Sequence, residues 1–209
     1  MKILNLYAGI GGNRKNWGNN HEITSIENNE EIAKIYKDYF PTDNVIIADA
    51  HKYLLNNYKN FDFIWSSPPC QSHSRVRKMQ ENTNHFIPVY PNMNLYQEII
   101  FLKTHFKGKF IIENVIPYYE PLVKPNYIID RHFFWCNFIF DEIKFCPHTN
   151  IKDIKITQNR YGFDLNNYKL TKRKDQILRN CVNPDLSNYI LNFAINNKIN
   201  PITKQLKLI

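Results

Sequence analysis

Short apolar runs alternate with helical patterns over the first 115 residues of the chain. Strand-like runs occur at residues 2–8, 22–27, 44–50, 61–67 and 109–115. Between them, apolar side chains recur at three- and four-residue spacing, as in amphipathic helices, at residues 28–40, 51–58 and 94–106. This alternation predicts an α/β fold in which a mostly parallel sheet is covered by helices on both faces.

The pattern changes after residue 115. The aromatic run "RHFFWCNFIF" at residues 131–140 predicts a further strand, and residues 184–197 predict a C-terminal helix. Residues 72–93 are mostly polar and include Arg75, Arg77 and Lys78. A loop of that length inside a compact domain is usually functional, so we expect a mobile lid there.

Composition narrows the class of protein only slightly. With 209 residues, 43% of them hydrophobic, the chain can form one domain with a sizeable core. It contains no run of 18 apolar residues and starts directly with a strand pattern, so we expect neither a membrane span nor a signal peptide. Four widely spaced cysteines fit a reducing cytoplasm. The net charge of +8 suits a polyanionic partner and mere solubility equally well.

A glycine-rich turn, "AGIGG", directly follows the first predicted strand. In parallel sheets, ligands bind at the carboxyl ends of the strands. Gly9, Gly11 and Gly12 would let the backbone turn sharply and approach such a ligand, although tight packing of a strand against a helix requires the same residues.

Two acidic residues end the next two strands, Glu27 and Asp49. Acidic side chains beside a glycine turn can hold ribose hydroxyls and an adenine amino group. Glu27 could equally cap the helix that begins near Asn28. Taken together and in this order, the two acids favour a cofactor that contains adenosine.

The stretch "WSSPPCQSHSR", residues 65–75, places Cys70 after two prolines at the end of a buried strand. Either the thiol is a passenger in a rigid turn or the turn aims a nucleophile. In "ENV", Glu113 follows an apolar run, and burial favours the neutral form of a carboxyl group, so Glu113 could donate a proton to a ring nitrogen. Pairing with a lysine is the alternative. Arg131 could pair with Glu113, contact a base carbonyl or be a surface cation, whereas we interpret His132 as packing.

In sequence order, "AGIGG", Glu27, Asp49, "PPCQ", "ENV", Arg131 and "LRNCVNPDL" resemble the DNA (cytosine-5) methyltransferase family. The resemblance extends from residue 3 to about residue 191 and is strongest to compact, phage-type members. It implies a Rossmann-like methyltransferase fold and S-adenosylmethionine as cofactor. It also implies a set of residues that bind the cofactor: Tyr7, Ala8, Gly9, Gly11, Gly12, Glu27, Asp49, Pro68 and Asn180.

The same resemblance implies a catalytic set. Cys70 would add to C6 of cytosine, Glu113 would bind N3 and the amino group, and Arg131 would hold O2 and orient Glu113. The target base would be flipped out of the duplex. The residues expected to contact the nucleic acid are Gln71, Ser74, Arg75, Arg77 and Lys78.

The resemblance divides the chain into three parts. Residues 1–140 would form the catalytic and cofactor-binding domain, residues 141–175 a minimal target-recognition insert, and residues 176–209 the segment that completes the catalytic domain. Only 41 residues separate Phe138 from Asn180, which suffices for a hairpin and a basic loop but not for a full domain. A homodimer or a partner protein could compensate. Cys146 and His148 lack a second pair of ligands, so we expect no metal.

Double-stranded DNA is the first expected substrate, and protection of DNA against nucleases is the role that the resemblance implies. RNA or single-stranded nucleic acid is the alternative, because so small a protein could lack the reach to read a major groove. A non-catalytic nucleic-acid-binding relative is a third hypothesis, against which the set of Cys70, Glu113 and Arg131 argues. An adenine methyltransferase is disfavoured, because that reaction needs a polar and an aromatic residue beside the proline pair rather than a cysteine.

Overall fold

The computed structural model describes residues 1–79, 87–141 and 154–196, without the side chain of Lys78. Their strands form one sheet of seven, in the order β3-β2-β1-β4-β5-β7-β6. Their bounds are β1 Lys2–Leu6, β2 Glu22–Glu27, β3 Asn44–Ile47, β4 Phe63–Ser66, β5 Lys109–Val115, β6 Tyr127–Ile129 and β7 His132–Cys136. The first five strands pair in parallel, and β7 runs antiparallel to both β5 and β6. The fold is therefore the predicted Rossmann-like α/β fold, with an antiparallel edge.

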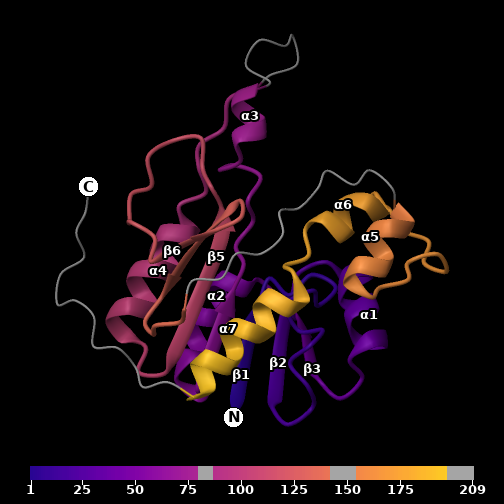
Figure 1. The fold of residues 1–209 in the computed structure, drawn as a ribbon, viewed down its shortest axis with the longest axis horizontal. Helices are drawn as coiled ribbons and strands as arrows, with labels where there is room; N and C mark the ends of the chain where they lie inside the picture. Colours follow the sequence, from indigo (N-terminus) through magenta and orange to yellow (C-terminus); the bar gives the residue numbers. More distant parts are fainter. Residues whose placement is uncertain (80–86, 142–153, 197–209) are drawn as a thin grey trace.

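Helices cover both faces of the sheet (Figure 1). Their bounds are α1 Glu30–Tyr39, α2 Ala50–Asn57, α3 Arg75–Met79, α4 Asn94–His105, α5 Ile154–Tyr161, α6 Lys174–Arg179 and α7 Pro184–Asn196, with the short 3-10 helix η1 at Tyr58–Asn60. One face packs on α2 and α4, and the other packs on α1 and α7. The alternation of side chains along each strand produces this division: Leu4 and Ile64 face α4, whereas Ile3 and Phe63 face α7.

The five predicted parallel strands, the three predicted helices between them, the aromatic strand and the C-terminal helix are all present. The predicted loop 72–93 differs in part, because α3 forms directly after the cysteine turn. Between residues 154 and 179 we expected no helix, but α5 and α6 are present, and no hairpin forms in that range. Apolar residues explain the difference: Tyr161, Phe163 and Ile177 pack with α1. Cys146 and His148 lie outside the described residues.

A buried ion pair anchors the segment that follows the glycine turn. Arg14 donates from Nε and Nη2 to the two carboxylate oxygens of Asp43 at 2.7 and 3.0 Å, and both side chains are 2% exposed. The hydroxyl of Tyr36 on α1 donates to the same carboxylate at 2.8 Å and accepts from Ser25 on β2. The network therefore fixes the turn to the strands and to α1.

No helix among the described residues is long and apolar enough to cross a bilayer.

We expect Asp43→Ala to lower the free energy of unfolding by about 3–5 kcal/mol, because it leaves the guanidinium of Arg14 buried without its counter-charge. Urea denaturation followed by circular dichroism measures this loss. Arg173→Ala is the matched control, since Arg173 pairs with Asp175 in solvent and its loss should hardly move the midpoint. Equal losses in the two variants would show that the buried network does not stabilise the fold.

Candidate active site

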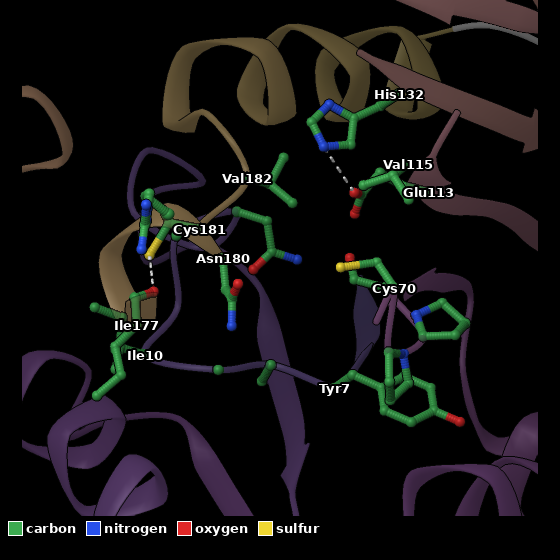
Figure 2. A pocket seen from close by; sticks show the side chains of 18 of the residues that line it. Tyr7, Ile10, Cys70, Glu113, Val115, His132, Ile177, Asn180, Cys181 and Val182 are labelled. Carbon is green, nitrogen blue, oxygen red and sulfur yellow. Dashed lines mark hydrogen bonds and ion pairs between the residues drawn. The ribbon is translucent and has the colours of Figure 1, made fainter. Parts of the chain in front are cut away.

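A cavity of about 290 Å³ opens at the carboxyl ends of β1, β2, β4 and β5. Its wall contains the glycine turn, the cysteine turn after β4, the ends of β5 and β7, and residues 177–183 from α6 and the turn after it. Figure 2 shows Cys70, Glu113 and His132 on one side of this space, with Asn180 and Val182 opposite and Tyr7 below. Cavities of this size at this edge of an α/β sheet bind small ligands.

The turn that carries Cys70 contains two prolines, which have no backbone N–H to donate. The carbonyl oxygen of Pro68 instead accepts a hydrogen bond from Nδ2 of Asn114, a buried side chain at the end of β5, at 2.8 Å. The carbonyl of Cys70 accepts from the backbone N–H groups of His73 and Ser74, both at 3.0 Å. The thiol is thereby held at a fixed position between β4 and β5.

Glu113 lies at the end of β5 beside this thiol and is 9% exposed. Burial is the main cause that raises the pKa of the Cys70 thiol above its ordinary value, and the nearby charge of Glu113 raises it further. The thiol is therefore mostly protonated at neutral pH. Two of the three side chains that sequence reasoning assigned to the chemistry, Cys70 and Glu113, share one wall of the cavity.

Arg131 does not join them, and its predicted pairing with Glu113 is wrong for this structure. Its side chain is 58% exposed and lies 3.9 Å from the carboxylate of Asp130. Arg131 occupies the turn before β7, and the register of β7 turns the next residue, His132, toward Glu113 instead. The predicted packing role of His132 is corrected accordingly: its Nε2 lies 3.7 Å from Oε1 of Glu113.

The glycine turn forms the floor of the predicted cofactor site. Tyr7 and Gly9 have positive φ, at 56° and 55°, and a Cβ at Gly9 would meet nothing within 4 Å. A Cβ on Gly12 would lie 2.6 Å from the Cβ of Cys181, so only glycine allows residues 181–182 to close over the turn. Gly11 lies below, against Phe40, and does not line the cavity.

Glu27 at the end of β2 connects two elements of this floor. One carboxylate oxygen accepts from the backbone N–H of Gly9 at 3.0 Å, and the other accepts from that of Asn29, the N-cap of α1, at 2.9 Å. The functional and the capping interpretations of Glu27 are therefore compatible, since a carboxylate has lone pairs left for hydroxyl groups of a ligand.

Asp49 behaves differently from Glu27. Its Oδ1 accepts from the backbone N–H of Lys52 at 2.9 Å, which makes it the N-cap of α2. Its side chain is exposed and does not line the cavity, because capping directs it along the helix. The other predicted cofactor residues in the wall are Ala8, Pro68 and Asn180.

A buried carboxylate supports the glycine turn from below. Glu98 on α4 accepts from the hydroxyls of Tyr7 and Ser66 at 2.6 and 2.7 Å, and lies 3.0 Å from Nδ1 of His51. Burial, followed by the charge of Glu98, raises the pKa of the Tyr7 hydroxyl, so Tyr7 stays protonated and donates. Sequence reasoning missed Glu98, because a single acidic residue on an apolar helix face gave no signal of its partners.

Of the predicted nucleic-acid contacts, Gln71 lines the cavity, whereas Ser74, Arg75 and Arg77 do not. Gln71 is exposed in its wall, and Ser74 forms an isolated bridge to Pro117. Arg75 donates from Nε to the carbonyl of Pro117 at 3.3 Å, and Arg77 donates from Nη2 to that of Ile87 at 2.6 Å. Each guanidinium keeps further N–H groups for other acceptors. The side chain of Lys78 lies outside the described part of the structure.

Lys172 and Arg179 also line the cavity, on the wall formed by α6 and the turn before it, and sequence reasoning did not assign them there. Arg179 pairs with Asp175 at 2.7 Å. Among the described residues, no group of three or more histidine, cysteine or acidic side chains could hold a metal ion.

Comparisons with known proteins place this geometry in a family. The family of C-5 cytosine-specific DNA methylases matches residues 1–118. A tRNA (cytosine(38)-C(5))-methyltransferase of Spodoptera frugiperda is 30% identical over 190 residues, which are 85% of this chain and 54% of the relative. A human protein of the same name is 24% identical over 117 residues, which are 50% of this chain and 30% of the human protein. The chain thus spans about half the length, or less, of these curated relatives.

Solved structures give weaker likenesses. The crystal structure of a DNMT2 mutant from Spodoptera frugiperda is 27% identical and covers 55% of this chain and 35% of its own, with a TM-score of 0.39. The structure of the methyltransferase EhMeth from Entamoeba histolytica is 18% identical. The match covers 55% of this chain and 38% of the EhMeth chain, with a TM-score of 0.37.

The family match covers more than half of the chain and includes the glycine turn, Glu27, Cys70 and Glu113. The cofactor of this family is S-adenosylmethionine. The chain belongs to the family of C-5 cytosine-specific DNA methylases.

Proposed function

We propose that this protein methylates C5 of cytosine in DNA, with Cys70 as the nucleophile and S-adenosylmethionine as the methyl donor. The observation that carries the proposal is the meeting of the Cys70 thiol and the Glu113 carboxyl group in the cavity whose floor is the glycine turn. Neither group alone would select this reaction, because a thiol or a carboxyl group also serves many others.

The pairing matters because C5 of cytosine is a weak nucleophile. The Cys70 thiol first loses its proton to solvent, and the resulting thiolate forms a bond to C6 as the C5–C6 double bond opens, which turns the ring into an enamine-like nucleophile at C5. After methylation, C5 loses its proton to a water molecule, the C5–C6 double bond forms again, and the bond between sulfur and C6 breaks to release both the product and the thiolate. The proline-rich turn holds the sulfur in place for both steps, through the hydrogen bond between Pro68 and Asn114.

Glu113 assists the same step from β5. Addition at C6 moves electron density onto the ring nitrogen N3 and onto the carbonyl oxygen O2. A carboxyl group within reach of N3 and the exocyclic amino group binds cytosine selectively and stabilises the charge at N3 by sharing a proton. Because Glu113 is 9% exposed, few water molecules compete for that contact.

S-adenosylmethionine supplies an electrophilic methyl group when bound. The residues that would hold it are those of the glycine turn, Glu27, Pro68 and Asn180. The open space above Gly9 lets a ligand approach the backbone closely, and Glu27 keeps acceptor capacity for ribose hydroxyls. Asp49, whose Oδ1 caps α2, does not line the cavity.

DNA is the first candidate substrate because the matching family is one of DNA methylases. RNA is the second candidate, and one observation favours it: both curated relatives are named tRNA methyltransferases. Catalytic residues do not discriminate between the two polymers, since the same base is modified in both. In duplex DNA the target base must leave the stack, at a cost of a few kcal/mol, whereas an unpaired base in an RNA loop is already accessible.

We expect the purified protein to transfer label from radioactive S-adenosylmethionine to duplex DNA, and digestion to nucleosides should give 5-methylcytosine. Cys70→Ser should reduce the transfer to background and still bind the cofactor in calorimetry, because the thiol is not needed for that binding. Cys136→Ala is the matched control, since this buried thiol lies outside the cavity and its loss should leave the label in place.

Parallel incubations with single-stranded DNA and tRNA separate the two candidates. Label in tRNA alone would replace DNA by RNA as the substrate. Label that persists in Cys70→Ser would refute Cys70 as the nucleophile. No label in any polymer, with cofactor still bound, would refute methyl transfer by this chain alone and favour a binding role.

Alkylation of Cys70 by iodoacetamide should rise steeply with pH above neutrality, because burial and Glu113 raise the pKa of its thiol and only the thiolate reacts. Glu113→Gln should move the midpoint to lower pH, since it removes a negative charge that disfavours the thiolate, but burial should keep the midpoint above that of a free cysteine. Mass spectrometry of the peptide that carries Cys70 measures both curves. Coincident curves would show that Glu113 does not act on the thiol.

Neutralising Arg75 and Arg77 together should weaken binding of nucleic acid and reduce its salt dependence. Two lost phosphate contacts lower the slope of log affinity against log salt by about 1.8 on duplex DNA and about 1.4 on single strands. Fluorescence anisotropy at several salt concentrations measures the slope. Lys34→Gln with Lys37→Gln on α1 is the control of equal charge, because both side chains are exposed on a helix that lies far from α3 (Figure 1). An equal slope for wild type and the arginine variant would exclude α3 from the contact.

A further inference from the structure

His132 is the first residue of β7 and faces the cavity because of the strand register. In the antiparallel pair of β5 and β7, Val115 lies opposite His132 and Glu113 opposite Phe134. Residues two apart on one strand share a face, so these four side chains lie on one side of the sheet. All four line the cavity.

The distance between the two polar members of this group is informative. Nε2 of His132 lies 3.7 Å from Oε1 of Glu113, which is too long for a good hydrogen bond. Figure 2 shows the two side chains converging on the part of the cavity that the sulfur of Cys70 also faces. The imidazole is 28% exposed and so is open to a ligand, whereas Glu113 is nearly buried. A bound base can therefore place an acceptor atom against the imidazole of His132 while a neighbouring atom of the same base contacts Glu113.

Cytosine has such an atom. Its O2 is adjacent to N3, so a base whose N3 contacts Glu113 presents O2 to a neighbouring side chain on the same wall. Addition of the Cys70 thiolate at C6 increases the negative charge on O2, and a donor there stabilises the transition state. The nearby side chain with a donor on β7 is His132, because the guanidinium of Arg131 is directed into solvent beside Asp130.

The other cations of the cavity wall are less suited to this position. Lys172 and Arg179 come from α6 and the turn before it, a segment that packs on α1 rather than on β5 and β7. Arg179 already pairs with the carboxylate of Asp175 at 2.7 Å. His132 alone of these three is a β7 residue placed beside Glu113 by backbone pairing.

We propose that His132 is a catalytic residue that donates its Nε2–H to O2 of the target cytosine while Glu113 holds N3 and the amino group. The inference rests on the proposed function, since it requires a cytosine in the cavity. Arg131, which sequence reasoning favoured for this contact, has no part in it. The donor is thus an imidazole in place of a guanidinium, with its Nε2 placed 3.7 Å from Oε1 of Glu113.

The test compares single-turnover methylation by wild type, His132→Phe, His132→Asn and Arg131→Gln on the polymer that wild type labels. His132→Phe keeps the ring but removes the donor, and His132→Asn keeps a donor that is too short to reach. Both should slow methylation by about 10²–10³-fold, the loss typical of one removed oxyanion donor. Arg131→Gln should keep the wild-type rate, because its side chain points away from the cavity.

Two further measurements exclude a merely structural effect. Cofactor affinity and the thermal midpoint should match wild type in every variant that shows the loss, and His132→Arg, which restores a long donor, should recover part of the rate. Wild-type rates in both His132→Phe and His132→Asn, or an equal loss in Arg131→Gln, would overturn the role of His132 and leave the proposed function standing. A wild-type protein that labels no polymer would overturn the proposed function and this inference with it.

Discussion

The arrangement of the site depends on one buried hydrogen bond, from the amide of Asn114 to the carbonyl of Pro68. The turn after β4 has few ways to fix itself, since Pro68 and Pro69 donate no backbone hydrogen bonds. Asn114 immediately follows Glu113, so the residue that immobilises the thiol turn is covalently adjacent to the carboxyl group that shares the cavity with the thiol. Any movement of the end of β5 therefore carries both groups together, and their separation is set by two neighbouring strands rather than by flexible loops.

A second constraint holds the cofactor half of the site to the same edge. Tyr7 has positive φ, which costs free energy for a residue with a side chain. Its hydroxyl is bound by Glu98, which also accepts from Ser66 at the end of β4. The buried carboxylate thus connects the glycine turn after β1 to the strand that leads into the cysteine turn. The floor of the cavity and the strand that leads to Cys70 share one anchor, which keeps the distance between them fixed.

Sequence patterns predicted the parts of this structure that depend on local periodicity. The parallel strands and their helices were found because apolar runs that are buried on both faces have few other structures available. Helices α5 and α6 escaped prediction because their polar, Asn- and Lys-rich segments carry few apolar residues, and the contacts that stabilise them are made with α1, far away in the sequence. Contacts with a segment far away in the sequence produce no hydrophobic periodicity from which a helix could be predicted.

The site shows the same limit at finer scale. The positions of the glycine turn, Cys70 and Glu113 at the edge of the sheet were predictable, because each follows or ends a recognisable strand. The choice between Arg131 and His132 was not, because it depends on where β7 begins: a shift by one residue exchanges the side chain in the cavity for the one in solvent. An arginine is also the more familiar donor to a carbonyl, which favoured the residue that does not line the cavity. The pairing of Val115 with His132 settles the register.

The placement of residues 154–179 bears on how recognition of a substrate could be divided. This segment packs on α1 and contributes one wall of the cavity, so its described part supports the cofactor side rather than reaching over Cys70. On the thiol side, the exposed Gln71 of the cysteine turn lines the cavity, and α3 begins shortly after it at Arg75. In the proposed function, the nucleophile and the expected first contacts with a polymer therefore come from the stretch that follows β4. Selection of a cytosine as a base, which we propose for Glu113 on β5 and His132 on β7, is then separable from selection of its sequence context, because the two would depend on different strands and turns.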